Sequence, residues 1–361
     1  MTSKLSFACC SIILASTLTP GASFGATNFV QKNLVSDQDG IADNKDPNLV
    51  GTWGMSTSPA SPFWVSNTSN GTSTLYNTAG VPNALVAVVP PSAINKGKTG
   101  TPTGQVWNGL GVFEIATGKV PTFIFATLDG TISGWNSTVG DGRTAVAKVD
   151  NGASGAVYTG LAIGTSSAGP TLYAANIAQG TIDTFDKNWA AVKLPGGFRD
   201  RDLPAGFAPS NIQRFGSRLY VTYNMPDGAG GLVIGAGTGL VNVFDVDGNL
   251  LQRLVPNNAT LNVPWGVAVA GPNFGTFSYA LLVGNFGDGT ISAFDPVTGN
   301  YIGTMQDGKG NNLSIDGLWG IQFGNGGNGG DPTALYFCAA PGGGAHGLLG
   351  SLKPAADSTT P

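Results

Sequence analysis

The chain has 361 residues, of which 56 are glycine and only 11% are charged, so the Glu, Lys and Arg that cover long helices are too few for a helical protein. A hydrophobic share of 41% supplies a large core and argues against disorder, and a net charge of −4 without a basic run argues against nucleic acid or an anionic membrane as partner. One histidine, His346, excludes any site that needs two imidazoles.

Residues 1–26 have the pattern of a secretory signal peptide. A short positive start is followed by the apolar stretch Leu5–Leu18 and by small residues at 23–26. The sequence therefore predicts a secreted or periplasmic protein, and no other segment is long and apolar enough to span a membrane. The mature chain then keeps a single cysteine, Cys338, in a strand-like run where a thiol is usually buried.

Two short phrases recur through the rest of the chain at intervals of about 54 residues. The first is a glycine, four residues, an aromatic residue and then Asp or Asn, and it begins at Gly71, Gly130, Gly180, Gly239, Gly289 and, in degraded form, Gly347. The second is a glycine that opens an alternating strand, and its copies are Gly54, Gly111, Gly160, Gly266 and Gly320. In the fourth unit Asn211 stands in place of this glycine. Four short strands per unit, repeated six times, predict an all-β six-bladed propeller of four-stranded antiparallel blades. The second glycine suits an innermost strand, where backbones converge on the axis.

The ring is predicted to close through the N-terminus. Residues 29–35 resemble the fourth strand at 250–255, whereas the last unit ends after Leu352 without a fourth strand. A single domain at 27–352, closed by an N-terminal strand that completes the last blade, removes two exposed sheet edges. Residues 353–361 are expected to form a flexible tail.

Unusual sequence gathers in the connections that face one side of such a ring, where ligands are expected. A Gly-rich insertion at 226–237 is a candidate lid, and Arg199 belongs to the densest charge cluster. Amides recur at the ends of the second strands, where they suit a hydroxyl-rich ligand or, alternatively, cap their own turns: Asn67, Asn176, Asn224 and Asn285. Trp53, Trp265 and Trp319 precede the axial glycines, either as a stacking platform or as packing between blades.

Catalytic and metal signatures are sparse. Glu114, expected in the innermost strand of the second blade, Asp202 and His346 are the candidate acids or bases. Asp37, Asp39 and Asp43 alternate as in a calcium loop, although no Glu follows at the twelfth position, so a solvated acidic loop is the alternative. The preferred interpretation is a monomeric propeller that binds a small molecule or glycan. A calcium-dependent hydrolase or lyase and a scaffold for protein partners at the envelope are the alternatives.

Three longer phrases carry a resemblance to a family. Residues 46–54, 203–213 and 317–327 resemble an uncharacterised family of exported six-bladed propellers, mostly bacterial. The resemblance implies the fold and export but no activity. More remotely, the blade pattern is similar to NHL-repeat and calcium-dependent lactonase propellers, whose metal sites use Glu with Asn or Asp around the axis; here that resemblance offers only Glu114 and scattered Asn and Asp.

Overall fold

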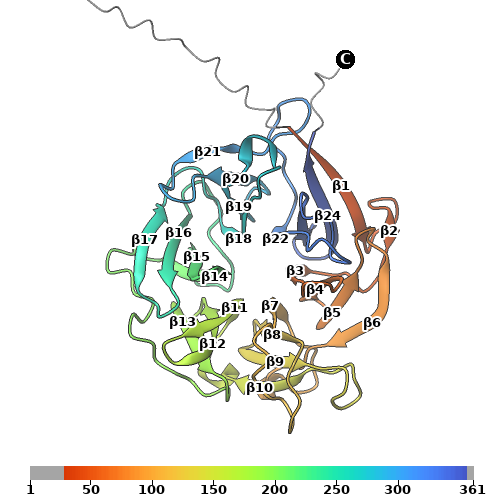
Figure 1. The fold of residues 1–361 in the computed structure, drawn as a ribbon, viewed down its shortest axis with the longest axis vertical. Coiled ribbons are helices and arrows are strands. Elements are labelled where there is room, and N and C mark those ends of the chain that lie inside the picture. The colour runs from red at the N-terminus through yellow and green to blue at the C-terminus, as the bar shows by residue number, and fades with distance from the viewer. Residues whose placement is uncertain (1–27, 356–361) are drawn as a thin grey trace, which may run out of the picture.

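The computed structural model describes residues 28–355, which form six antiparallel sheets around a central axis (Figure 1). The prediction of an all-β six-bladed propeller is confirmed. Blade 1 contains β3 (Thr52–Ser56), β4 (Phe63–Asn67), β5 (Thr72–Tyr76) and β6 (Pro82–Val88). Blade 2 contains β7 (Pro102–Trp107), β8 (Phe123–Thr127), β9 (Thr131–Trp135) and β10 (Val146–Asp150). Blade 3 has three strands, β11 (Tyr158–Ser166), β12 (Gly169–Asn176) and β13 (Thr181–Asp186).

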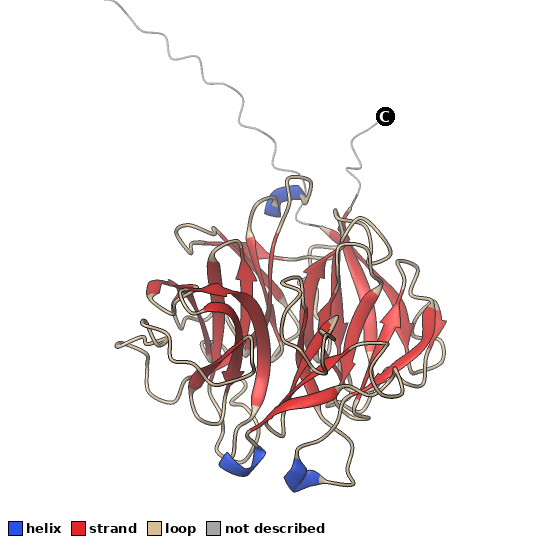
Figure 2. Cartoon of the chain, turned by 60° about the horizontal axis from the view of Figure 1, so that its bottom comes forward, coloured by secondary structure: helices blue, strands red, loops and turns tan. Residues whose placement is uncertain are grey.

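The second half of the ring continues this order. Blade 4 contains β14 (Ala208–Phe215), β15 (Arg218–Asn224), β16 (Gly239–Asp245) and β17 (Leu250–Val255). Blade 5 contains β18 (Pro264–Val269), β19 (Leu281–Asn285), β20 (Ile291–Phe294) and β21 (Tyr301–Thr304). Blade 6 contains β22 (Leu318–Phe323), β23 (Leu335–Ala339) and β24 (Leu348–Pro354). Three short 3-10 helices lie in loops at the faces of the ring: η1 (Ala93–Asn95), η2 (Gly152–Ser154) and η3 (Gly275–Phe277) (Figure 2).

The N-terminal strand completes blade 6 as predicted. Strand β1 (Phe29–Ser36) pairs antiparallel with β24, and the two-residue strand β2 (Asn44–Lys45) pairs parallel with β1. Strand β24 continues to Pro354, which pairs with Phe29, so the ring includes two residues that the sequence assigned to the tail. The predicted signal peptide and the rest of the predicted tail lie outside the described residues. No helix in the described part of the chain is long and apolar enough to cross a membrane.

The innermost strands approach one another so closely that a side chain would collide with the next blade. A Cβ on Gly54 would lie 2.4 Å from the carbonyl oxygen of Thr103, and one on Gly104 would lie 2.6 Å from the amide nitrogen of Leu161. A Cβ on Gly320 would lie 3.0 Å from the carbonyl oxygen of Trp53, which closes the circle. The axial-glycine prediction is therefore confirmed at Gly54 and Gly320, and blade 2 also has an axial glycine, at a different residue from the predicted one.

The assignment of Gly111 to the axis is wrong. The innermost strand of blade 2 is β7, at 102–107, and its axial glycine is Gly104. Gly111 lies in the loop between β7 and β8 with a φ of 62° and no atom within 4 Å of a built Cβ. Gly111 stands before the apolar Val112 and so matches the expected pattern, whereas the axial Gly104 stands before the polar Gln105 and does not. The local pattern therefore selected a turn glycine instead of the axial one.

The core lies between neighbouring blades. Phe63, Tyr76 and Phe337 are among the largest fully buried side chains. Cys338 is fully buried in the layer between blades 6 and 1, and burial raises the pKa of its thiol to about 12. This thiol is a packing residue, as expected for a buried cysteine in a strand.

Candidate functional site

The axis of the ring ends in a cluster of tryptophans on one side. Trp53 and Trp319 stack with ring centroids 3.9 Å apart, and Trp265 meets them edge-on at 6.5 and 6.1 Å. Phe286 stacks on the other side of Trp319 at 4.1 Å. We call these four residues the tryptophan cluster. Each tryptophan is the second residue of its innermost strand, so the cluster lies at the end of the axis where these strands begin, and we call this the plugged end.

The insertion at 226–237 covers the plugged end. Leu232 packs against the tryptophan cluster, and Pro226 and Leu232 form an antiparallel bridge. The carboxylate of Asp227 accepts hydrogen bonds from the amides of Ala229 and Gly231 at 2.7 and 2.9 Å, which orders the turn between them. Trp265 and Trp319 are only 5% exposed. The packing interpretation therefore accounts for the tryptophans, and their role in ligand binding stays a prediction.

The four recurring asparagines are also fully buried. The amide of Asn67 donates to the hydroxyls of Thr72 and Thr74, and that of Asn285 donates to Thr290 and Ser292. Asn176 donates to Asp183, and Asn224 donates to Ser210. Each amide thus binds within its own blade, as the capping alternative stated. Their binding role is untested, and no exposed ring of amides forms at this face from them.

The opposite side of the axis holds an open cavity of about 410 Å³. All six innermost strands line it, as the arrangement around the axis in Figure 1 leads one to expect. Ser56, Trp107, Phe215 and Phe323 line it from the last positions of β3, β7, β14 and β22. We call this space the channel cavity and its side the open end. At the open end Trp107, Phe215 and Phe323 are half-buried, whereas at the plugged end the tryptophans pack against one another.

Amide groups give the channel cavity its polarity. Gln105 is buried and donates to the carbonyl oxygens of Gly54 and Trp64, so its amide belongs to the scaffold. Gln322 is half-buried and donates to the hydroxyl of Thr57 at 3.2 Å. Gln213 is half-buried and lines the cavity, and its side chain forms no hydrogen bond to another described residue. The Arg214 guanidinium binds the carbonyl oxygens of Ile163 and Gly216 at 2.7 Å each.

Sequence reasoning missed Gln213 and Gln322, although a signal was present. Each stands two residues after the axial position, as Asn211-Ile212-Gln213 and Gly320-Ile321-Gln322. Because side chains in a strand alternate with a period of two, this spacing puts both amides at the same end of the channel. The binding residues expected from the sequence lie instead at the ends of the second strands and at the plugged end.

The three candidate acids and bases lie apart. Glu114 is exposed in the β7–β8 loop rather than in an innermost strand, so its predicted placement is wrong, and its backbone oxygen accepts from the indole of Trp189. Asp202 is exposed in the connection between blades 3 and 4. His346 lies in the β23–β24 loop of blade 6, where its Nδ1 is 2.8 Å from Asp37. The structure brings no two of these candidates together.

The acidic loop does not gather its carboxylates. Asp37 binds His346 and the amide of Gly347, Asp39 pairs with Lys45 at 2.8 Å, and Asp43 pairs with Lys32 at 2.9 Å. Within residues 28–355, no group of three His, Cys, Asp or Glu side chains is placed to hold a metal ion. The calcium ligands that the lactonase resemblance implies therefore do not fit these residues, because Glu114 is exposed in the β7–β8 loop and does not lie in an innermost strand.

No family model matches the chain, but comparison with other protein sequences finds relatives. Uncharacterised protein R648 of Acanthamoeba polyphaga mimivirus is 32% identical over 333 residues, which are 88% of this chain and 78% of R648. Uncharacterised protein L690 of the same virus is 32% identical over 331 residues, or 88% of this chain and 84% of L690. The chain belongs to this family. These relatives are viral, so they do not support the mostly bacterial membership that the resemblance implied.

Solved structures share the fold at low identity. A streptogramin B lyase aligns with a TM-score of 0.52 and 14% identity over 91% of this chain and 99% of its own. A calcium-binding regucalcin from Agrobacterium tumefaciens aligns with a TM-score of 0.53 and 13% identity over 90% of this chain and 94% of its own. At this identity the likeness establishes a propeller similar to those of enzymes and binding proteins, and transfers no site.

Proposed function

We propose that this protein binds a small hydroxyl-rich ligand, such as a monosaccharide or a short glycan, in the channel cavity. The observation that carries the proposal is the convergence of all six innermost strands on a cavity of about 410 Å³ that contains the unpaired amide of Gln213. This volume lies in the range of small-ligand sites, and such sites combine apolar walls with a few polar groups.

The lining suits a sugar better than a charged metabolite. A side-chain amide both donates and accepts hydrogen bonds, which matches a hydroxyl group. Trp107, Phe215 and Phe323 offer aromatic surface to the C–H faces of a sugar ring. Arg214 is the one charged residue that lines the cavity, and two of its donors are already used by backbone carbonyls. The proposal keeps the ligand class expected from the sequence and places it at the open end.

Calorimetric titration with a panel of monosaccharides and disaccharides tests the proposal. For a sugar that binds, we expect Gln213→Ala and Trp107→Ala each to weaken the affinity by about tenfold, or 1.4 kcal/mol. Gln252→Ala is the matched control, because Gln252 is exposed on β17 and lies outside the cavity. Equal affinity in the Gln213 variant and the control would place the sugar elsewhere, and turnover of a bound sugar would replace binding by catalysis.

We also propose that the protein is exported. The support is the signal-peptide pattern at 1–26. Expression of the full chain in a bacterial host, followed by N-terminal sequencing of the protein from the cell exterior or periplasm, tests this. We expect a new N-terminus between Ser23 and Asn28, whereas an uncleaved chain in the cytosol would contradict export.

A further inference from the structure

Blade 3 lacks the outer strand that every other blade has. Its sheet has the order β11-β12-β13, whereas the other blades have at least four strands each. After β13 the chain turns at 186–190 and runs back along its first residues. The amide of Asp186 donates to the carbonyl oxygen of Ala190, Phe185 and Ala191 form an isolated antiparallel bridge, and the amide of Val192 donates to the carbonyl oxygen of Thr184 at 2.9 Å. Lys193-Leu194-Pro195 follows, and none of these three residues forms a backbone hydrogen bond to β13.

The chain that leaves blade 3 is fixed to blade 4. The amides of Gly196 and Phe198 donate to Asp247 and Gly248 at 2.9 and 3.0 Å. A Cβ on Gly196 would lie 2.2 Å from the Asn249 amide nitrogen, so this approach requires glycine. The ring of Phe198 packs on Tyr173 and Phe244, with centroids 5.8 and 5.2 Å away.

A buried ion pair holds the same segment one step further along. Asp200, whose side chain is 3% exposed, accepts two hydrogen bonds from Arg253 and one from Asn242 at 3.0 Å. Asp200 stands between Arg199 and Arg201, so its contacts hold this part of the backbone against blade 4. The segment at 196–201 therefore forms a wall attached to blade 4 through Gly196, Phe198 and Asp200.

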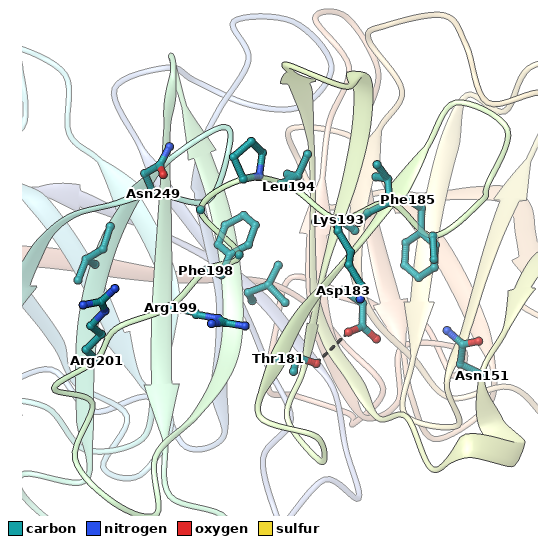
Figure 3. Close-up of a pocket in the computed structure, with 18 residues that line it drawn as sticks. Asn151, Thr181, Asp183, Phe185, Lys193, Leu194, Phe198, Arg199, Arg201 and Asn249 are labelled. Atoms are coloured by element: carbon teal, nitrogen blue, oxygen red, sulfur yellow. Dashed lines mark hydrogen bonds between the residues drawn. The ribbon is translucent and has the colours of Figure 1, made fainter.

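Between this wall and β13 lies a groove of about 970 Å³, which we call the blade 3 groove (Figure 3). The Thr184 carbonyl oxygen points outward to Val192, so by the two-residue period of a strand the N–H and C=O of Ile182 point to the same side. No described backbone group pairs with Ile182 on that side. The edge of β13 is thus open at Ile182, whereas its outward groups at Thr184 and Asp186 are taken by residues 190–192. An open sheet edge of this kind accepts an added strand.

The groove is positively charged although the chain is acidic overall. Lys193, Arg199 and Arg201 line it, are exposed and form no ion pair with any described residue. Figure 3 shows Arg199 and Arg201 on the wall and Asp183 with Thr181 on the β13 side. Asp183, the one acidic residue in the lining, already accepts from Tyr158, Asn176 and Thr181. Three cations against one carboxylate leave the lining of the groove with a net positive charge.

We propose that the blade 3 groove binds an extended acidic segment of a partner protein, which adds to β13 as the missing fourth strand. Backbone hydrogen bonds to Ile182 would supply the pairing, and acidic side chains on alternate residues would meet Lys193, Arg199 and Arg201. The site is independent of the channel cavity, so a protein partner and a small ligand can be held at the same time.

Fluorescence anisotropy with a labelled peptide, in which Val or Thr alternates with Asp or Glu, tests the proposal. We expect binding that weakens as salt is raised, because exposed charges are screened. The same peptide with alternate backbone nitrogens methylated keeps the charge but loses half of its donors, and a second peptide replaces Asp and Glu by Asn and Gln. Each change is expected to weaken binding by about tenfold or more.

Protein variants separate pairing from charge. Ile182→Pro removes the outward N–H at an edge strand, which tolerates proline, and Ile182→Val is its control. Arg199→Glu with Arg201→Glu reverses the wall, and Arg143→Glu with Lys148→Glu reverses two exposed cations of blade 2. We expect loss of binding in the first variant of each pair and wild-type affinity in the second.

Three outcomes would overturn the proposal. The first is failure of the acidic peptide to bind the wild-type protein. The second is unchanged binding of the N-methylated peptide, which remains decisive even if Ile182→Pro does not fold. The third is competition by dextran sulfate as strong as that by the unlabelled peptide, because this polyanion has no peptide backbone and would indicate charge attraction alone.

Discussion

Asn211 occupies the position at which five of the six innermost strands carry glycine. Its side-chain nitrogen, Nδ2, donates to the backbone carbonyl oxygen of Trp265 at 2.8 Å. Its side-chain oxygen, Oδ1, lies 2.5 Å from where a Cβ of Gly160 would stand. One side chain thus spans from blade 4 to blade 5 and demands glycine in blade 3. At the scale of single residues, the space that the adjacent blade leaves decides whether an axial position is glycine or a larger residue.

Gly104→Ala tests the axial assignment. The new methyl group would lie 2.6 Å from the backbone of Leu161, so we expect a loss of about 1–3 kcal/mol in the free energy of unfolding, measured by urea titration. Gly308→Ala is the control, because it has open space and no positive φ. A Gly104 variant as stable as the control would show that the strands can move apart.

Asp200 links stability to pH. Burial by itself raises the pKa of this carboxyl, but the hydrogen bonds from Arg253 and Asn242 outweigh it, so the pKa is lowered from its ordinary value. A lowered pKa means stability that is present above the unfolded-state pKa of about 3.9 and is lost as pH falls through the lower folded value.

We therefore expect Asp200→Asn to cost about 1.5–3 kcal/mol at neutral pH. The difference from the wild type should shrink as the pH is lowered below about 4, as measured by urea unfolding at several pH values. A difference that stays constant down to the acid range would show that the carboxylate charge contributes nothing.

At the scale of elements, the insertion at 226–237 shows how a glycine-rich segment becomes ordered. The sequence predicts a flexible lid with few buried contacts, whereas the structure has a bridged turn with Leu232 on the tryptophan cluster. The glycines supply the turn conformations, for example at Gly228 and Gly230 with φ of 77° and 95°. The segment covers the plugged end by apolar contact, and so belongs to the plug.

Leu232→Ser tests this contact. Loss of the apolar cover should let water reach the tryptophan cluster, which shifts the tryptophan emission to longer wavelength and costs about 1 kcal/mol. Val233→Ser, at a neighbouring residue that is 39% exposed, is the control and should change neither quantity. Identical spectra for the two variants would mean that the insertion does not seal the cluster.

At the scale of the whole molecule, one seam holds the ring closed. Strand β1 joins blade 6 through pairing from Phe29 to Ser36, and β24 extends to Pro354 on the same ladder. The amide of Ala355 also donates to the carbonyl oxygen of Asn28 at 2.9 Å. Because residues 28–36 and 348–355 meet in one blade, the closure depends on residues that are far apart in sequence.

Two truncations and one deletion test the seam by thermal unfolding and size-exclusion chromatography. Removing 356–361 should leave the melting temperature unchanged, whereas ending the chain after Leu352 removes two paired residues and should lower it. Deleting 27–36 exposes the edge of β24 and should cause aggregation. A monomeric deletion variant with an unchanged melting temperature would refute closure by β1.

The sequence by itself determined the repeat number and the strand alternation, because these depend on short-range patterns. It also determined the closure, because counting the strands leaves one strand without a blade at 29–35 and a last blade without its fourth strand. A glycine, an aromatic residue and an Asp or Asn at fixed spacing specify a hairpin turn within one blade. The strand at 29–35 stands before the first blade, and it completes the last blade, which lacks a fourth strand of its own. These features are local, or are related by simple counting along the chain.

Only the tertiary structure decided which glycine of blade 2 meets the axis, where the amides point and which blade lacks a strand. Gly111 matches the glycine-apolar pattern and Gly104 does not, so only the close contact with Leu161 identifies Gly104 as the axial glycine. The recurring asparagines became internal hydrogen-bond donors because their own blades supply hydroxyl and carboxylate acceptors. The blade 3 groove exists because the pairing with β13 ends at Val192 while Phe198 and Asp200 bind blade 4. Such outcomes depend on contacts between residues tens of positions apart, and a repeat pattern does not encode them.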